Sequence, residues 1–360
     1  MFNVPTVTVA KTTLDSTSDS VTLDYAAPNG VAWTPRHLVV RTNVRATTGT
    51  PNMFVRLNGD TGSNYNIQGL QGYSSSTFAA RGSGVAYFSF PDAIVSTANE
   101  FSSSETLFPD ALSTRSHKSA LSFNGRTEDN VRVAAGRWAS TAAITSITFY
   151  TSAEAFAAGS TFELCVVDET FNIDEQIKTG DGTFAVSSID AADGDLVVIG
   201  NLRSDRNAAG DAVVHNINDD GTSGNYAGQA LYGDNTTVGA FAPTLNIANI
   251  TGNTATTSAF GVMVGQFSNF ADGANDPAYN FLAGYHAASD NASVYLYSTR
   301  RNNVEAITKL EFSPESSTNF ITGSMLSTYA VPKNLIERQE LGAAANITFS
   351  DIPQTYDHLE

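Results

Sequence analysis

The chain repeats itself, and this internal repeat constrains the fold more than any other feature of the sequence. The segment NYNIQGLQG, residues 64–72, recurs as NYAGQALYG, residues 225–233, at an offset of 161 residues. A repeat at a fixed offset indicates one structural unit used more than once. The identical pairs are Asn64 and Asn225, Tyr65 and Tyr226, Gln68 and Gln229, Leu70 and Leu231, and Gly72 and Gly233.

Flanking segments match at almost the same offset. HLVV at residues 37–40 matches DLVV at 195–198, and AITSITF from Ala143 matches AITKLEF from Ala306. The last match pairs FAAGSTFELCVV from Phe156 with FITGSMLSTYAV from Phe320. The offset grows slowly along the repeat, as insertions in loops would produce. We therefore predict two copies of one domain, at residues 1–170 and 183–331, with a linker at residues 171–182.

A third copy begins near the end of the chain. TFSDIPQTYDHL, residues 348–359, has the form of TFAVSSIDAADGDL, residues 183–196. We predict that residues 347–360 are the first strand of a third repeat. This strand either continues into a further domain, which we favour, or pairs with a neighbouring domain or chain. Residues 332–346 are predicted to be a linker, helical because Pro332 and Gly342 stand where a helix begins and ends.

Within each copy the pattern is typical of strands. Short runs such as SVTLDY, MFVRLN and VAYFSF are separated by Gly, Asn, Asp and Ser, and amphipathic helices between them are lacking. The predicted fold class is all-β, with two tandem antiparallel β-sandwich domains of jelly-roll-like form and the start of a third. Sandwiches joined by short linkers also predict an extended rod.

Composition and charge exclude several classes of partner. The chain has 36 acidic against 19 basic residues, a net charge of −17, which repels phosphate, so we predict no nucleic-acid partner. Cys165 is the only cysteine, so no disulfide can form within the chain. No run of 18 apolar residues is present, which predicts no membrane insertion, and the N-terminus lacks a signal-peptide pattern.

The segment around the repeat has two interpretations. As a ligand loop, it could bind a cation or a sugar. As structure, Tyr65 and Gln68 would anchor the turn and Leu70 would enter the core; we favour this because these residues recur. The preceding acidic turn changes from NGDTGS to NDDGTSG and is expected to be free for another role. The candidate ligands are Asn58, Asp60, Asn64 and Tyr65.

Other motifs with catalytic or metal-binding chemistry are weak. The acidic turns at residues 218–225, 190–195 and 272–277 do not fit the EF-hand pattern. The sequence contains no HExxH pair, no GxSxG turn and no phosphate loop. Cys165 matches Tyr329 of the second copy, so a buried core cysteine is the favoured interpretation. We predict no catalytic, cofactor-binding or metal-binding residues, and no enzyme. The histidines are His37, His117, His215, His286 and His358.

Aromatic residues offer a binding alternative. A set of them could stack on sugars, although aromatics in strands more often pack in cores or in cross-strand pairs. Neither tryptophan recurs in the second copy, which suggests a role peculiar to the first domain, such as docking. The set is Trp33, Trp138, Tyr73, Tyr87, Tyr150, Tyr295 and Tyr297.

Three segments resemble virion structural proteins of tailed bacteriophages, a family of tandem β-domain components of tails, fibres and capsid decorations. They are LNGDTGSNY at residues 57–65, ITSITFYTSAEAFAAGSTFELCV at 144–166 and ITFSDIPQTYDHL at 347–359. The first copy matches best and the second is more divergent. The resemblance implies a non-enzymatic role in an assembled particle and supplies no catalytic residues.

From the repeat, the missing motifs and this resemblance, we predict a structural component of a virion, either a tail or fibre attachment protein or a capsid decoration protein. Expected partners are other virion proteins of the tail, the portal-proximal region or the capsid, together with further copies of the chain in a homo-oligomer. The binding alternative is a carbohydrate-recognising module that attaches the particle to a host surface glycan. The enzymatic alternative, a polysaccharide depolymerase, requires two carboxylates about 5–9.5 Å apart across a cleft.

Overall fold

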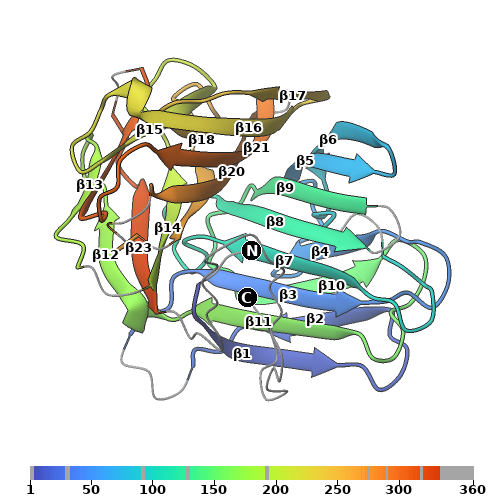
Figure 1. The fold of residues 1–360 in the computed structure, drawn as a ribbon. Coiled ribbons are helices and arrows are strands. Elements are labelled where there is room, and N and C mark those ends of the chain that lie inside the picture. Colours follow the sequence, from blue (N-terminus) through green and yellow to red (C-terminus); the bar gives the residue numbers. More distant parts are fainter. Residues whose placement is uncertain are drawn as a thin grey trace, which may run out of the picture.

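The computed structural model describes residues 4–28, 33–90, 94–126, 130–190, 194–268, 270–271, 273, 276–288, 291–316 and 319–332. They form strands β1 to β23 and two 3₁₀ turns, η1 (Glu169–Phe171) and η2 (Ser223–Asn225). Each half of the chain is a sandwich of one eight-stranded sheet and one smaller sheet, and all strand pairs within the sheets are antiparallel (Figure 1). The predicted all-β sandwich fold is confirmed.

The first sandwich contains eleven strands. Its large sheet has the order β1-β11-β3-β7-β8-β9-β5-β6, and its small sheet has the order β2-β10-β4. The strands are β1 (Thr6–Thr13), β2 (Ser20–Asp24), β3 (Leu38–Val44), β4 (Met53–Leu57), β5 (Tyr65–Tyr73), β6 (Ser76–Val85), β7 (Ser102–Phe108), β8 (Lys118–Arg126), β9 (Asn130–Trp138), β10 (Ser146–Thr151) and β11 (Thr161–Val167).

The second sandwich repeats this arrangement. Its large sheet has the order β12-β23-β14-β19-β20-β21-β16-β17, and its small sheet has the order β13-β22-β15-β18. The strands are β12 (Asn172–Ile177), β13 (Phe184–Ser187), β14 (Gly194–Leu202), β15 (Gly210–Ile217), β16 (Tyr226–Asp234), β17 (Thr237–Phe241), β18 (Asn246–Thr251), β19 (Gly261–Ser268), β20 (Ala278–Ala288), β21 (Asn291–Arg301), β22 (Lys309–Pro314) and β23 (Met325–Pro332).

Each sandwich is a jelly roll with two inserted hairpins. In the second, the orders β12-β23-β14-β19 and β13-β22-β15-β18 are the two four-stranded sheets of a jelly roll. Hairpins β16–β17 and β20–β21 then widen the large sheet beyond β19. Hairpins β5–β6 and β8–β9 widen the first large sheet beyond β7 in the same way. The repeated segment at residues 64–72 and 225–233 therefore marks an inserted hairpin, at β5 and β16.

The predicted linker is partly strand. Residues 172–177 form β12, the edge strand of the second large sheet, where it pairs with β23 as β1 pairs with β11. Its alternation is weak because an edge strand is buried little, which explains why the sequence pattern misses it. The predicted helical linker, apart from Pro332, and the predicted strand at residues 347–360 lie outside the described residues.

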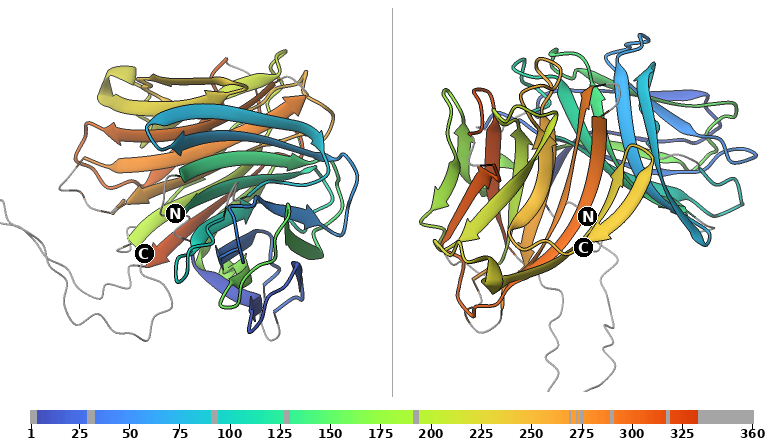
Figure 2. Two further views of the ribbon diagram at one scale, coloured as in Figure 1. Left: turned by 90° about the vertical axis from the view of Figure 1, so that its right-hand side faces the viewer. Right: turned by 90° about the horizontal axis from the view of Figure 1, so that it is seen from above.

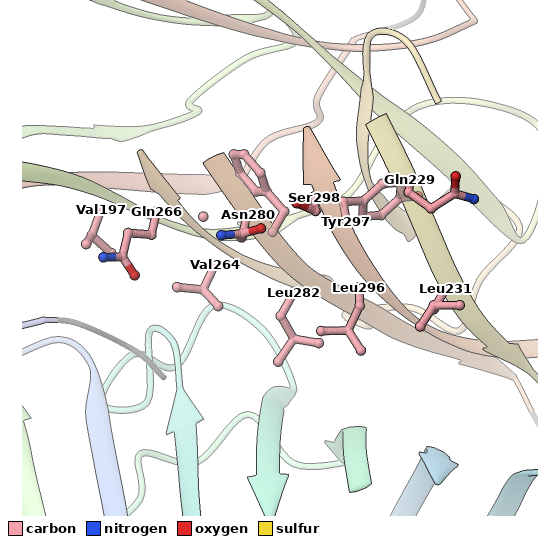
Figure 3. A pocket seen from close by; sticks show the side chains of 12 residues that line it. Val197, Gln229, Leu231, Val264, Gln266, Asn280, Leu282, Leu296, Tyr297 and Ser298 are labelled. Atoms are coloured by element: carbon pink, nitrogen blue, oxygen red, sulfur yellow. The ribbon is translucent and has the colours of Figure 1, made fainter. Parts of the chain in front are cut away.

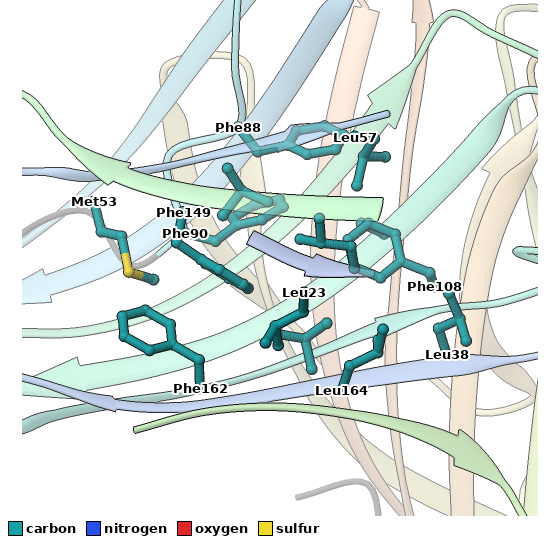
Figure 4. Close-up of a cluster of buried hydrophobic side chains, with 14 of the residues drawn as sticks. Leu23, Leu38, Met53, Leu57, Phe88, Phe90, Phe108, Phe149, Phe162 and Leu164 are labelled. Carbon is teal, nitrogen blue, oxygen red and sulfur yellow. The ribbon is translucent and has the colours of Figure 1, made fainter. Parts of the chain in front are cut away.

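Each sandwich has its own apolar core between its two sheets. Side chains of the small sheet alternate between the core and the opposite face: in β2 and β4, every second side chain is buried between the two sheets. In the first core, Phe149 of β10 packs against Phe162 of β11 with ring centroids 5.1 Å apart (Figure 4). In the second, Phe184 packs against Phe320 at 5.0 Å.

The two large sheets are also buried on their outer faces, because they pack against each other. All nine residues of β14 are buried, a pattern that one-sided burial cannot produce. A third apolar cluster joins the two halves of the chain, so the predicted extended rod is wrong: the sandwiches lie side by side (Figure 2). Its residues include Val39, Leu70, Leu107, Leu121, Val133, Ala135 and Cys165 from the first sandwich, and Val197, Ile199, Val262, Val264, Leu282, Val294 and Tyr329 from the second.

The inserted hairpins contribute to this interface, and equivalent strands lie close together in it. β5 contacts β16 and β21, β6 contacts β17 and β16, β8 contacts β20 and β19, and β9 contacts β21 and β20. Each strand thus lies over its equivalent and over the neighbour of that equivalent. The sheets approach closely at Gly284, where a Cβ atom would lie only 2.4 Å from the Cβ of Ala135. A Cβ on Gly233 would lie 3.2 Å from that of Leu70, so two glycines permit the contact.

Hydrogen bonds flank the apolar contact. Ser119 donates its hydroxyl to the carbonyl of Phe260 at 2.7 Å, and the amide of His117 donates to the carbonyl of Ser258 at 2.9 Å. At the hairpin end, both Gln68 and Arg81 donate to Asn235, each at 3.0 Å. These bonds fix the rotation of one sheet relative to the other, which an apolar contact alone leaves loose.

Gly284→Ala is expected to destabilise the protein by about 1–3 kcal/mol, because the added methyl group forces the large sheets apart. Urea unfolding measures the change. Gly72→Ala is the matched control: this glycine lies on the outer face of the first large sheet, where a Cβ would make an ordinary 3.4 Å contact with Val131. Equal stabilities of the two variants would contradict the close approach at Gly284.

Candidate functional site

The repeated tyrosines anchor the turn that precedes them, as the sequence predicts. Tyr65 is fully buried, and its hydroxyl accepts a hydrogen bond from the amide of Leu57 at 3.0 Å and donates to the carbonyl of Asp60 at 3.1 Å. Tyr226 does the same with the amide of Ile217 and the carbonyl of Asp220, at 3.1 and 2.7 Å. A buried phenol that ties down its own turn has a structural role.

The asparagine at the start of the turn is also structural in both copies. Asn58 has a positive φ of 51°, and its side-chain oxygen accepts from the amides of Thr145 and Ser146 at 2.7 and 3.1 Å. Asn218 has a φ of 52° and holds Thr308 and Lys309 in the same way. Asparagine tolerates this left-handed conformation better than most residues.

The acidic turn is not free for another role, which corrects the expectation from the sequence. The carboxylate of Asp60 accepts from the indole of Trp138 at 2.6 Å, from Asn64 at 2.9 Å and from the amide of Gly62 at 2.8 Å. Burial would raise the pKa of Asp60, but these hydrogen bonds outweigh it and hold that pKa below its usual value. A carboxylate satisfied in this way is no ready cation ligand.

The second copy preserves the network with a different donor. Asp220 accepts from Asn225 at 3.0 Å and from the guanidinium of Arg301 at 3.1 Å. Arg301 pairs with Tyr226 across β16 and β21, as Trp138 pairs with Tyr65 across β5 and β9. Tryptophan and arginine thus supply the same N–H, and the single occurrence of Trp138 reflects this exchange rather than a docking role.

Gln68 and Leu70 belong to the interface, not to the turn or the core. Their equivalents, Gln229 and Leu231, line a groove on the outer face of the second large sheet. Gln68 donates to Asn235 of the other sandwich, so it does not anchor the turn. Leu70 enters the apolar cluster between the sandwiches, whereas the equivalent Leu231 is 49% exposed. The expectation that this leucine enters the sandwich core is therefore wrong.

Cys165 is fully buried, as predicted, and lies in the cluster between the sandwiches. Burial is also the largest influence raising the pKa of its thiol. In the part of the chain that the structure describes, no three His, Cys, Asp or Glu side chains are grouped to hold a metal ion. Of the acidic turns, those at residues 190–195 and 272–277 fall partly outside the described residues, and His358 falls wholly outside them.

No helix among the described residues is long and apolar enough to span a membrane.

The candidate aromatic residues do not form one platform. Trp138 is 3% exposed, and Trp33 packs against the first core. Tyr295 and Tyr297 stack on each other at 5.7 Å, with Tyr297 only 2% exposed.

A separate aromatic patch covers the outer face of the first small sheet. Phe54 of β4 stacks on Tyr87 with centroids 3.8 Å apart, and Tyr150 of β10 lies 5.4 Å from Phe54. Arg56 lies 4.4 Å above the ring of Tyr150. All four side chains are partly exposed. We call Phe54, Arg56, Tyr87 and Tyr150 the aromatic patch. The second sandwich lacks it, since Val214 and Ser313 stand at the positions of Phe54 and Tyr150.

A groove of about 530 Å³ lies on the outer face of the second large sheet. Two rows of side chains line it, each crossing neighbouring strands in register. One row is polar, Gln266, Asn280, Ser298 and Gln229, and the other is aliphatic, Val264, Leu282, Leu296 and Leu231.

The groove borders on the interface between the sandwiches. Val264 and Leu282 belong both to its lining and to the apolar cluster that joins the two halves. Figure 3 shows the aliphatic row pointing from the second sheet toward strands of the first sandwich. The groove is therefore the part of the outer face, beyond the contact, that the first sandwich leaves uncovered.

The side chains that line the groove are uncharged. Among the described residues that line it there is no carboxylate, imidazole, thiol, ammonium or guanidinium group. Tyr297 and Phe281 reach it only with their backbone side, because their rings lie in the second core. Asn280 and Ser298 are exposed and offer both donors and acceptors beside an aliphatic surface.

Comparison with known proteins finds a remote structural likeness. No known family matches the chain, and no curated protein matches it. Among solved structures, a match is found to the LG1-3 region of the laminin alpha2 chain, with 9% identity and a TM-score of 0.21. The match covers 87% of this chain and 64% of the laminin chain. At this TM-score the likeness supports no argument about function.

Tyr65→Phe and Tyr226→Phe are each expected to destabilise the protein by about 1–3 kcal/mol, because each leaves a buried amide without its acceptor. Chemical denaturation measures this loss. Tyr73→Phe, at a tyrosine that is 41% exposed, is the control and should change stability by less than about 0.5 kcal/mol. If both core variants behaved like the control, the tyrosines would not anchor the turns.

Proposed function

We propose that this chain is a structural component of a tailed-phage virion, a tail or fibre attachment protein or a capsid decoration protein, that acts by assembly without catalysis. The groove supports a role in assembly, because its aliphatic row and its polar row suit a segment of another protein. The resemblance of the sequence to virion structural proteins supports the assignment to a virion. The groove is the docking site for a neighbouring virion protein.

The chemistry of the groove favours a polypeptide over other ligands. Amide and hydroxyl side chains can pair with peptide N–H and C=O groups, while Leu231, Leu282 and Leu296 bury apolar side chains of the segment. No aromatic ring presents its face among the described lining residues, which disfavours sugar stacking there. The lining also lacks the carboxylate pair that a depolymerase would need.

Continuity with the interface between the sandwiches adds support. The same outer face already binds one β-sheet, the first large sheet, through Val262, Val264 and Leu282. A partner segment in the groove would extend this contact along the aliphatic row. Peptide mass spectrometry and immunogold labelling of purified particles test the virion assignment, and particles that lack the chain would refute it.

Leu231→Asp is expected to lower incorporation into particles at least tenfold, because it places a charge on the aliphatic row of the groove without touching either core. Quantitative mass spectrometry of purified particles measures the copy number. Val304→Asp is the matched control, since Val304 is also a solvent-facing aliphatic residue, 57% exposed, and does not line the groove. Full incorporation of the Leu231 variant would remove the groove as the docking site.

The aromatic patch supports a second candidate function, recognition of a host surface glycan. Stacked rings beside a cation suit the C–H face and the hydroxyl or acid groups of a sugar. Phe54, Tyr87 and Tyr150 supply the rings, and Arg56 supplies the cation. This function is compatible with a virion component, because the patch and the groove lie on different sheets of different sandwiches.

Tyr87→Ala combined with Tyr150→Ala is expected to weaken glycan binding at least tenfold on a glycan array, which corresponds to about 1.4 kcal/mol of lost stacking. Tyr73→Ala, at an exposed tyrosine outside the aromatic patch, should bind as the unchanged protein does. If the unchanged protein bound no glycan on the array, the second candidate would be excluded and the proposal for the groove would stand.

A further inference from the structure

A cluster of basic side chains lies where β9 and β20 meet at the interface between the sandwiches. We call it the His–Arg cluster and define it as His117, Arg137 and His286. Arg137 of β9 is 6% exposed and His286 of β20 is 2% exposed. The charges that act on the two imidazoles come from Arg137, together with Arg81 on His286 and with Lys118 and Arg203 on His117. All of these charges are positive.

His117 belongs to the same cluster but is partly exposed. Arginine can only donate, so the guanidinium of Arg137 donates to Nδ1 of His117, at 3.4 Å. Both of these residues belong to the first sandwich, so this contact does not cross the interface. The backbone of His117 donates to Ser258 of the second sandwich.

His286 has no group to share a proton with. Neither of its ring nitrogens has a hydrogen-bond partner among the described residues. Two residues before it, Gly284 lies so close to Ala135 that a Cβ would be 2.4 Å away, so the two sheets are in close contact near this histidine. The charges nearest to it belong to Arg137 of β9 and Arg81 of β6, both on the opposite sandwich.

We propose that the interface is an acid-triggered joint: protonation of His286 separates the two large sheets at the His–Arg cluster while each sandwich stays folded. The observation that carries this is the imidazole of His286, which is buried in the contact between two independent cores and has no hydrogen-bond partner among the described residues. Each core has its own apolar cluster, so loss of the contact leaves both cores intact.

The direction of the pH dependence follows from linkage. Burial, then Arg137 and Arg81, lowers the pKa of His286 to about 3, from an ordinary value of 6.5. The ring is neutral in the closed form and in the open form above pH 6.5, so it contributes nothing to opening there. As the pH falls below 6.5, only the open form takes up a proton on this ring, and the closed form loses stability.

At the opposite end of the interface, carboxyl groups make the closed form more stable as the pH falls, which opposes the effect of the histidines. His37 accepts from the amide of Asp110 and donates to the hydroxyl of Ser327, each at 3.2 Å, and burial and Arg36 lower its pKa to about 3. Carboxyl groups lie near it, however: burial raises the pKa of Asp110, and that of Glu169 to about 7. These acids favour the closed form as the pH falls, so they offset His37.

The single cysteine reports on opening. Cys165 is fully buried in the cluster between the sandwiches, so a thiol reagent reaches it when the sheets separate. The rate of its reaction with a dipyridyl disulfide, which remains active in acid, is measured from pH 8 to pH 5. It is divided by the rate for the urea-unfolded chain at each pH, which removes the effect of thiol ionisation. Far-UV circular dichroism monitors the sandwiches in parallel.

His286 is expected to raise the opening equilibrium about 30-fold between pH 8 and pH 5. The normalised labelling rate should therefore rise about 30-fold while the dichroism spectrum is unchanged. In the variant His286→Gln, the rate should become nearly independent of pH. Ser119→Ala is the matched control: it removes a neighbouring interface bond without a titratable group, so it should raise the rate equally at every pH.

The measured quantity is the slope of the rate with pH, so a variant that merely loosens the interface cannot imitate the effect. The proposal is overturned if labelling of the unchanged protein does not accelerate in acid. It is also overturned if the His286 variant keeps the slope, or if labelling follows loss of the dichroism signal.

Discussion

The contact between the two large sheets is the constraint on which the rest of the structure depends. Without it, the apolar outer faces of both large sheets would be exposed to water. These faces carry Val39 and Leu121 in the first sheet and Ile199 and Val262 in the second, and a few polar contacts could not offset the cost of exposing them. With it, the two sandwiches form one body. This contact buries the thiol of Cys165 and His286, and it leaves the groove uncovered beside it.

The fold was predictable from the sequence to the extent that it depends on local pattern. The repeat, the short alternating runs and the absence of helix patterns indicate two β-sandwiches, and the structure has them. The prediction of an extended rod was wrong because it assumes that each domain buries all of its apolar surface by itself. The continuous run GDLVVIGNL of β14 was the available signal, since a strand that is apolar throughout must be covered on both faces.

The site was less predictable, because single residues there have roles set by distant strands. The turn that contains Asp60 differs in sequence between the two copies, yet Asp220 accepts the equivalent hydrogen bonds in the second copy. The donor is Trp138 in one and Arg301 in the other, and these become equivalent only once β9 and β21 are placed beside β5 and β16. The groove depends on cross-strand register over four strands, to which no short motif corresponds.

The contact between the sheets has a consequence for each sandwich taken alone. Strands of the inserted hairpins lie beside their equivalents, β5 beside β16 and β9 beside β21. A single sandwich with these hairpins would expose its apolar outer face unless another sheet covered it. In this chain the repeat itself supplies that second sheet, so each half depends on the other, while the aromatic patch belongs to one half and the groove to the other.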